Sequence, residues 1–276
     1  MRGLRKRDSR GVGIMQNEKR VREPAVAGQF YPEGREELQR QVAEFLKSAA
    51  APKAGEIPKC IVVPHAGYAY SGKIAGQGFR AAENAKPKNI VIAGPSHYVE
   101  FEGSALSGAD AWKTPLGEIN VNKKYFEESE TALVEFDEAH QQEHSVEVQV
   151  PFIQAVFPKA KIVPVVTGEV EPEQLAEDID SGLGKSDLLV VSTDLSHYYP
   201  YEEARKIDAV ANSAIPKLEI ETVEEKVEAC GKTGVLALMH LAKKRAWKGK
   251  LLAYANSGDT AGDKRRVVGY GAYGFY

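Results

Sequence analysis

The sequence contains few cysteines and no long apolar run. Its two cysteines, Cys60 and Cys230, lie far apart in a chain of 276 residues. Two thiols are too few for a disulfide framework, so the small disulfide-rich secreted class is excluded and a cytoplasmic location is expected. No uninterrupted apolar stretch approaches the roughly 20 residues that a membrane-spanning helix needs. We therefore expect a protein that does not enter a membrane.

The chain also lacks an excess of positive charge. It carries 36 Lys and Arg residues against 39 Asp and Glu, for a net charge of -3, and its isoelectric point is about 6.1. This balance argues against a broad basic surface that binds nucleic acid or an anionic membrane. The expected ligand is a small molecule or a peptide.

A complete phosphate-binding loop is missing as well. The stretch EACGKTG at 228–234 contains the Gly-Lys-Thr ending of such a loop, but the loop also requires a glycine five positions before Gly231. That position is Lys226, and the preceding LEIETVEEKVEA has the charged pattern of a helix. A nucleotide site is therefore excluded here, and Cys230 needs another explanation.

The chain is expected to form one domain after a short tail. The first twenty residues, MRGLRKRDSRGVGIMQNEKR, are basic and lack the apolar core of a secretory signal. We expect residues 1–20 to be a disordered tail, with a translation start at Met15 as the alternative. Residues 21–276 show no internal repeat, low-complexity linker or shift in composition, which favours a single domain.

Strand-like and helix-like segments alternate along this domain. Runs of β-branched and aliphatic residues favour buried strands: CIVVP at 60–64, NIVIAGP at 89–95, AKIVPVV at 160–166, DLLVVS at 187–192 and GKLLAYAN at 249–256. Amphipathic stretches such as REELQRQVAEFLKSA and TGVLALMHLAKKRAW separate them and favour helices. This alternation predicts an α/β three-layer sandwich with a mainly parallel or mixed central sheet. The glycine-rich RVVGYGAYGFY is expected to be the final strand.

Histidine follows three of the predicted strands. His65, His97 and His197 stand in the turns of IVVPHAGYAYSG, IVIAGPSHY and LLVVSTDLSHY. The carboxyl ends of parallel strands meet at one edge of a sheet, so we expect these three imidazoles to lie close together. Such repetition favours a functional site over three unrelated surface histidines.

Three further histidines have weaker patterns. His140 and His144, in DEAHQQEHSVEVQ, lack the central glutamate of a zinc-protease helix. His144 remains a candidate for the site, whereas His140 is interpreted as a solvated residue at a helix entry. His240, on the apolar face of LALMHLAKK, is interpreted as a core or boundary residue.

Cys230 has the chemistry of a metal ligand. Imidazoles and a thiolate are the donors that borderline or soft transition metals select. Cys230 lies in a glycine-flanked turn where a helix is expected to begin, and this position favours the thiolate form. The alternative for Cys230 is a small buried apolar residue, an interpretation that suits Cys60 better. Asp194, three residues before His197, either orients a histidine or caps the local backbone. His197, if it does not bind metal, is suited to shuttle a proton.

From Val21 onward the chain contains, in this order, VREPAVAGQFYP, PHAGYAYSG, GPSHY, TPLG, EHSVEVQVPF, STDLSHY and CGKTGV. These motifs and their order resemble those of the MEMO family over nearly the whole chain. The family is similar in fold to the catalytic subunits of class III extradiol dioxygenases, in which two histidines and a glutamate hold Fe(II). The resemblance implies radical-SAM and AMMECR-type protein partners. It also implies roles for six residues: His65 and His97 as metal ligands, Cys230 in the place of the carboxylate, His197 as acid/base, and Asp194 and His144 beside the pocket.

Three functions remain open on these grounds. The first is an iron-dependent redox or dioxygenase-like enzyme with Fe(II) as cofactor. The second is a non-catalytic protein that binds metal or a phosphopeptide, and the third is a zinc-dependent hydrolase. Copper(I) and zinc are alternative cofactors, because a thiolate is a softer ligand than a carboxylate and favours these ions. A serine hydrolase is disfavoured because Ser96 and Ser192 lack the Gly-x-Ser-x-Gly turn.

Overall fold

The computed structural model describes residues 19–53 and 55–276. The expected tail lies outside the described residues except for its last two, and so does Met15. A mixed sheet forms the centre of the molecule, with strand order β10-β12-β2-β9-β3-β8-β4-β7 and β11 paired to β12. Its inner strands run parallel in four neighbouring positions: β2 (Cys60–Val63), β9 (Leu188–Ser192), β3 (Asn89–Pro95) and β8 (Lys161–Thr167).

Antiparallel strands extend this parallel centre on both sides. On one side β12 (Val267–Phe275) runs antiparallel to β2, and both β11 (Gly249–Asn256) and β10 (His197–Tyr199) run antiparallel to β12. On the other side β4 (Ser104–Leu106) is antiparallel to β8 and carries the short β7 (Val134–Glu135). The sheet is therefore mixed.

A second, three-stranded sheet was not foreseen from the sequence. It contains β1 (Val21–Arg22), β5 (Ala111–Thr114) and β6 (Gly117–Asn120), with β1 parallel and β6 antiparallel to β5. The backbone of Arg20 also hydrogen-bonds to Asp110, so the chain is attached to this sheet just before β1.

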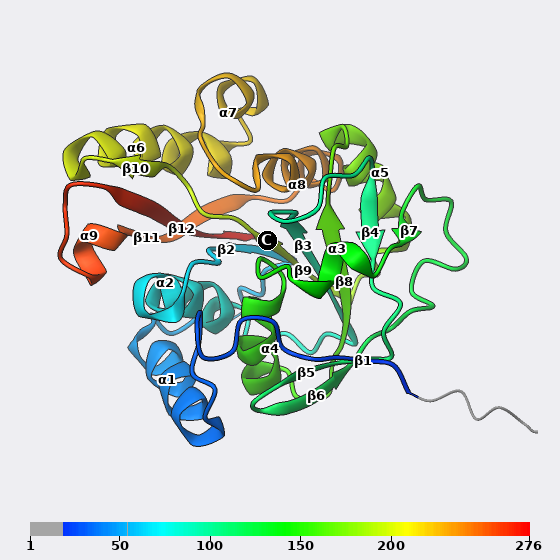
Figure 1. Ribbon diagram of the computed structural model, residues 1–276. Helices are drawn as coiled ribbons and strands as arrows, with labels where there is room; N and C mark the ends of the chain where they lie inside the picture. Colours follow the sequence, from blue (N-terminus) through cyan, green and yellow to red (C-terminus); the bar gives the residue numbers. More distant parts are fainter. Residues whose placement is uncertain (1–18, 54) are drawn as a thin grey trace, which may run out of the picture.

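Helices cover both faces of the central sheet (Figure 1). One face carries α1 (Arg35–Ser48), α2 (Tyr68–Ala81) and α4 (Val150–Val156). The other carries four helices: α5 (Pro172–Gly182), α6 (Tyr201–Lys217), α7 (Ile220–Lys226) and α8 (Lys232–Lys244). Short helical turns complete the set: α3 (Glu138–Gln141), η1 (Glu147–Gln149) and α9 (Ser257–Thr260).

The apolar strands serve both layers because their side chains alternate. Ile61 and Val63 of β2 pack with α1 and α2, whereas Cys60 and Val62 pack with α8. Continuous apolar runs are typical of strands that are covered on both faces. The predicted three-layer α/β sandwich is confirmed. No helix in the described part of the chain is long and apolar enough to span a membrane.

Candidate metal centre

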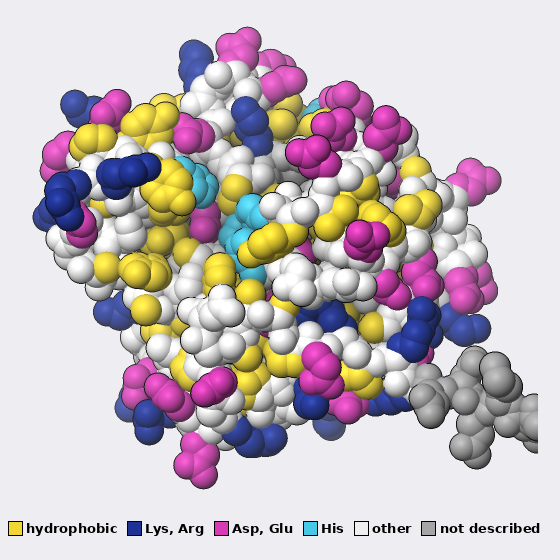
Figure 2. Space-filling view, in the orientation of Figure 1, with side chains coloured by type: hydrophobic (Ala, Val, Ile, Leu, Met, Phe, Trp, Pro, Cys, Tyr) yellow, Lys and Arg dark blue, Asp and Glu magenta, His cyan; other side chains and the backbone are white. Residues whose placement is uncertain are grey.

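Three imidazoles converge at the carboxyl edge of the parallel strands. His65 follows β2, His97 follows β3, and His144 lies between α3 and η1. Each ring offers one nitrogen that lies within 4.8 Å of a nitrogen of the other two. The ring centroids are 5.2 Å apart for His65 and His97 and 4.5 Å for His97 and His144. Figure 2 shows histidine side chains at the surface near the middle of this face, bordered by hydrophobic side chains.

Cys230 lies beside this cluster. Its Sγ is 3.1 Å from Nε2 of His65 and accepts a hydrogen bond from the backbone N–H of Asp194 at 3.3 Å. The residue stands in the turn before α8, whose N-cap is Gly231. The predicted neighbours His65 and Cys230 are thus in contact, although 165 positions separate them.

The hydrogen bonds of Ser192 determine which nitrogen of His65 faces Cys230. The Ser192 hydroxyl donates its only proton to the carbonyl of Ser145 at 2.6 Å and accepts from Nε2 of Gln149 at 2.8 Å. Nδ1 of His65, 3.0 Å from the same oxygen, must therefore be the donor. Nε2 is then the ring nitrogen that faces the Cys230 sulfur.

His97 is oriented by Glu143, a residue that the sequence reasoning missed. The buried Glu143 carboxylate accepts from Nδ1 of His97 at 3.0 Å, from its backbone N–H at 2.6 Å and from the N–H of Ser145 at 2.8 Å. Burial alone would raise the pKa of Glu143, but the hydrogen bonds from His97 and Ser145 lower it to about 2. For His97 the signs are reversed. Burial alone would lower its pKa, but hydrogen bonds with Cys230 and Glu143 raise it to about 9.

His144 is held as a neutral imidazole. Its ring packs against Phe30 at 4.5 Å and against Tyr98 at 5.9 Å between centroids. Burial, followed by the charge of His65, lowers its pKa to about 3. Nδ1 lies 3.4 Å from Oε1 of Glu143, but it is buried without a hydrogen-bond partner among the described residues. A neutral ring with a free nitrogen fits a metal ligand, whereas a pKa of about 3 makes the ring a weak proton acceptor near neutral pH.

Asp194 and His197 are not part of the cluster of three imidazoles. Asp194 Oδ1 accepts from the backbone N–H groups of His65 at 2.8 Å and Ala66 at 3.3 Å. The carboxylate thus holds the turn after β2 through its backbone. His197 begins β10, opposite Val268, and its ring packs against Tyr198 at 5.8 Å. It is outside the group whose ring nitrogens converge, so its role as proton shuttle stays a prediction.

His140 and His240 lie outside the cluster, and each has a polar partner of its own. His140 was interpreted as solvated, and this interpretation is wrong: the residue is 2% exposed, and Nε2 lies 3.2 Å from the carbonyl of Ala105. Burial, followed by the positive charge of Arg22, lowers its pKa to about 4. His240 is part-exposed and lies 3.2 Å from Glu173, as expected of a residue at the core boundary.

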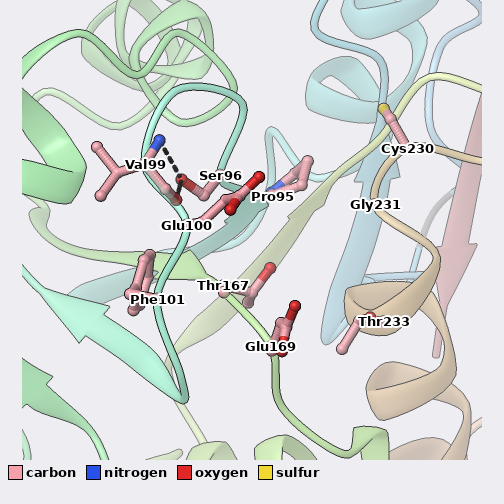
Figure 3. Close-up of a pocket in the computed structure, with 11 residues that line it drawn as sticks. Pro95, Ser96, Val99, Glu100, Phe101, Thr167, Glu169, Cys230, Gly231 and Thr233 are labelled. Atoms are coloured by element: carbon pink, nitrogen blue, oxygen red, sulfur yellow. Dashed lines mark hydrogen bonds between the residues drawn. The ribbon is translucent and has the colours of Figure 1, made fainter.

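A cavity of about 230 Å³ adjoins Cys230. Its walls are the loop after β3, the end of β8 and the start of α8. Figure 3 shows Cys230 and Thr233 on one side of this space and Glu100 and Glu169 across from them. This volume is below the roughly 300–1,000 Å³ of typical ligand pockets, so the cavity has room only for a small ligand.

The fold and this cluster define an α/β protein with a candidate mononuclear metal centre at the carboxyl edge of its sheet. The family model described as Memo-like protein matches residues 22–273. The chain belongs to this family.

Curated relatives agree with this assignment. The chain is 40% identical to a MEMO1 family protein of Aquifex aeolicus, covering 91% of this chain and 97% of the relative. It is 38% identical to one of Desulfurococcus amylolyticus, with 92% and 99% covered. A MEMO1 family protein of Nitrosopumilus maritimus is 33% identical, with 92% and 99% covered.

Proposed function

We propose that this protein binds one transition-metal ion between His65, His97 and Cys230, and that it uses the ion in redox chemistry on a small molecule. The observation that carries the proposal is the convergence of these side chains from three separate segments. His65 and Cys230 are in contact, and a nitrogen of His97 lies within 4.8 Å of one of His65.

The donor set fits a metal ion. Ser192 and Glu143 hydrogen-bond Nδ1 of His65 and of His97, so Nε2 of each ring is the atom that a metal ion would bind. At His97 the ion would displace the proton that a pKa of about 9 keeps on the ring near neutral pH. Histidine ligands in metalloproteins are commonly fixed in this way, by a hydrogen bond to the other ring nitrogen. Two imidazoles and one anionic group leave coordination positions open for substrate or O₂. Fe(II) is the proposed cofactor, as in dioxygenase-like proteins.

The chain's own residues would orient the centre and handle protons. When bound, the ion supplies Lewis acidity and one-electron redox chemistry. His144 is a neutral imidazole beside the ligands, and its pKa of about 3 suits it to hydrogen-bond the substrate rather than to act as a base near neutral pH. Asp194 fixes the turn that carries His65. His197 is the proposed proton shuttle between the substrate and solvent.

The substrate would occupy the cavity next to Cys230. Among the described residues that line this space, the charged ones are Glu100 and Glu169 and none is basic. Radical-SAM and AMMECR-type proteins are the proposed partners, through the family resemblance.

A non-catalytic metal-binding role is the second candidate, and a specific observation favours it. The third proposed ligand is the Cys230 sulfur, which as a metal-bound thiolate would prefer copper(I) or zinc to iron and would itself be open to oxidation. With zinc, the same three donors would suit a hydrolase that uses metal-bound water.

The test is metal analysis of protein purified without added metal, followed by anaerobic loading with Fe(II) and measurement of oxygen uptake with catechols. We expect one ion per chain in the wild type, and loss of that ion in His65→Gln and Cys230→Ser. Cys60→Ser is the matched control, because Cys60 is fully buried in β2 and should not alter binding. Equal metal content in Cys230→Ser and the wild type would contradict the proposed ligand set. Retained iron without oxygen uptake would favour the non-catalytic role.

A further inference from the structure

The stretch Arg22–Tyr31, called here the N-terminal segment, contacts residues 140–147, the stretch that carries Glu143 and His144. We infer that this segment positions the metal centre, with Arg22 and Phe30 as its positioning residues. The inference rests on the proposed metal site and adds a part of the chain that supplies no ligand. It accounts for the motif VREPAVAGQFYP, which the site itself leaves unexplained.

Arg22 connects three points of the 140–147 stretch. Its Nε donates to the carbonyl of His140 at 2.7 Å, Nη2 to the carbonyl of Glu143 at 2.9 Å, and Nη1 to Oε2 of Glu147 at 2.5 Å. The side chain is only 8% exposed, and its guanidinium lies 4.2 Å from the ring centroid of Trp112. One rigid fork thus fixes the backbone on both sides of the turn that leads to His144.

Glu147 closes this connection from the other side. Its buried carboxylate accepts from the N–H of Ala25 at 2.8 Å, the N–H of Val26 at 3.1 Å and the hydroxyl of Tyr31 at 2.5 Å. Charge-assisted hydrogen bonds of this kind are stronger than neutral ones. The N-terminal segment and the 140–147 stretch therefore form one hydrogen-bonded unit.

Phe30 contacts the candidate site directly. Its ring lies 4.5 Å from that of His144, tilted by 43°, and its carbonyl accepts from the N–H of Tyr68 at 2.7 Å, close after His65. The segment therefore contacts His144 on one side and the turn that follows His65 on the other.

This geometry predicts a link between the segment and metal affinity. If Glu143 shifts, the hydrogen bond that orients His97 shifts with it. A lysine in place of Arg22 keeps the charge, but all its donors lie on one nitrogen, whereas Arg22 donates from three separate nitrogens to its three partners. By reciprocity, a bound ion should stabilise the segment by the same free energy with which the segment favours the ion.

The test uses Co²⁺ as the probe, with visible absorption to report both affinity and ligand geometry. We expect Arg22→Lys to bind Co²⁺ more weakly and with a changed spectrum, by less than the roughly 10–100-fold typical of direct outer-sphere partners of metal ligands, because Arg22 acts through Glu143. Phe30→Leu keeps an apolar side chain but loses the ring contact with His144, whose ring lies 4.5 Å from that of the proposed ligand His97, so it should change the spectrum as well. It also serves as the second variant if Arg22→Lys does not fold.

Arg245→Lys is the matched control. Arg245 also donates to two carbonyls, those of Asp180 and Leu183, and pairs with a carboxylate, but it lies at the end of α8. We expect it to lower the free energy of unfolding and to leave Co²⁺ affinity and spectrum unchanged. In the wild type, Co²⁺ should slow hydrogen exchange at the amides of Ala25 and Val26.

Two results would be decisive against the inference. Wild-type affinity and spectrum in folded Arg22→Lys and Phe30→Leu, with no change in exchange at the segment, would overturn the positioning role and leave the metal site intact. Failure of the wild type to bind Co²⁺ would overturn the metal site, and the positioning role with it.

Discussion

Replacing Glu143 by glutamine tests how the site is held together. The carboxylate is fully buried and accepts three hydrogen bonds, two from His97 and one from Ser145. A glutamine keeps one acceptor oxygen but places an NH₂ group against at least one N–H donor. At least one charge-assisted bond is then lost and one donor is left unpaired inside the protein.

The expected cost follows from these contacts. Hydrogen bonds to charged groups contribute about 1.5–3 kcal/mol, and an unsatisfied buried group costs about 1–3 kcal/mol. Since neighbouring effects are not additive, we expect Glu143→Gln to lose about 2–4 kcal/mol of the free energy of unfolding. Metal affinity should also fall by roughly 10–100-fold, because the tautomer of His97 is no longer fixed.

Urea unfolding of the metal-free protein and titration with Co²⁺ would measure the two effects separately. Asp178→Asn is the matched control, because Asp178 is a buried carboxylate on α5 that accepts from Ala132 and Gln174. It should lower stability without changing Co²⁺ affinity. Unchanged stability together with unchanged affinity in Glu143→Gln would refute the assigned role of this carboxylate.

Three further outcomes are expected. The pKa of His140 is lowered to about 4, so as pH falls the unfolded chain takes up a proton at this residue before the folded protein does. Between pH 7 and 5 the wild type should therefore lose about 2 kcal/mol more of its free energy of unfolding, measured in urea, than His140→Gln loses. Equal losses would contradict a buried neutral imidazole. Burial raises the pKa of the Cys60 thiol, so an alkylating reagent should modify only Cys230 in the native protein, and bound metal should protect Cys230. Rapid labelling of Cys60 would be inconsistent with its packing. A Cβ at Gly168 would lie 2.1 Å from the carbonyl oxygen of Phe101, so Gly168→Ala should cost about 1–3 kcal/mol of stability, and an unchanged urea midpoint would show that the cavity wall is not tightly packed.

The layered fold and part of the site could be predicted because their signals are local. Apolar runs such as NIVIAGP mark strands that are buried on both faces, and a polar turn with histidine marks a carboxyl end. This pattern brought His65 and His97 to one edge correctly. The small sheet of β1, β5 and β6 has no comparable signal, because its strands are two to four residues long.

The supporting groups could not be predicted, because their contacts join distant segments. Glu143 binds His97 across 46 positions, and Arg22 reaches Glu143 across 121. His140 looked solvated because its neighbours in DEAHQQEH are polar, but α3 packs its ring near Trp112. The one available signal for Glu143 was its place directly before His144, and it would have become meaningful only once His144 was known to reach the cluster.

X-ray absorption at the metal edge of the loaded protein tests the central claim most directly, since it reports nitrogen and sulfur ligands together. We expect at least two imidazoles and one sulfur at roughly 2.3 Å from the ion, and loss of the sulfur signal in Cys230→Ser but not in Cys60→Ser. A first shell without sulfur in the wild type, or a spectrum unchanged by Cys230→Ser, would contradict a centre shared by His65, His97 and Cys230.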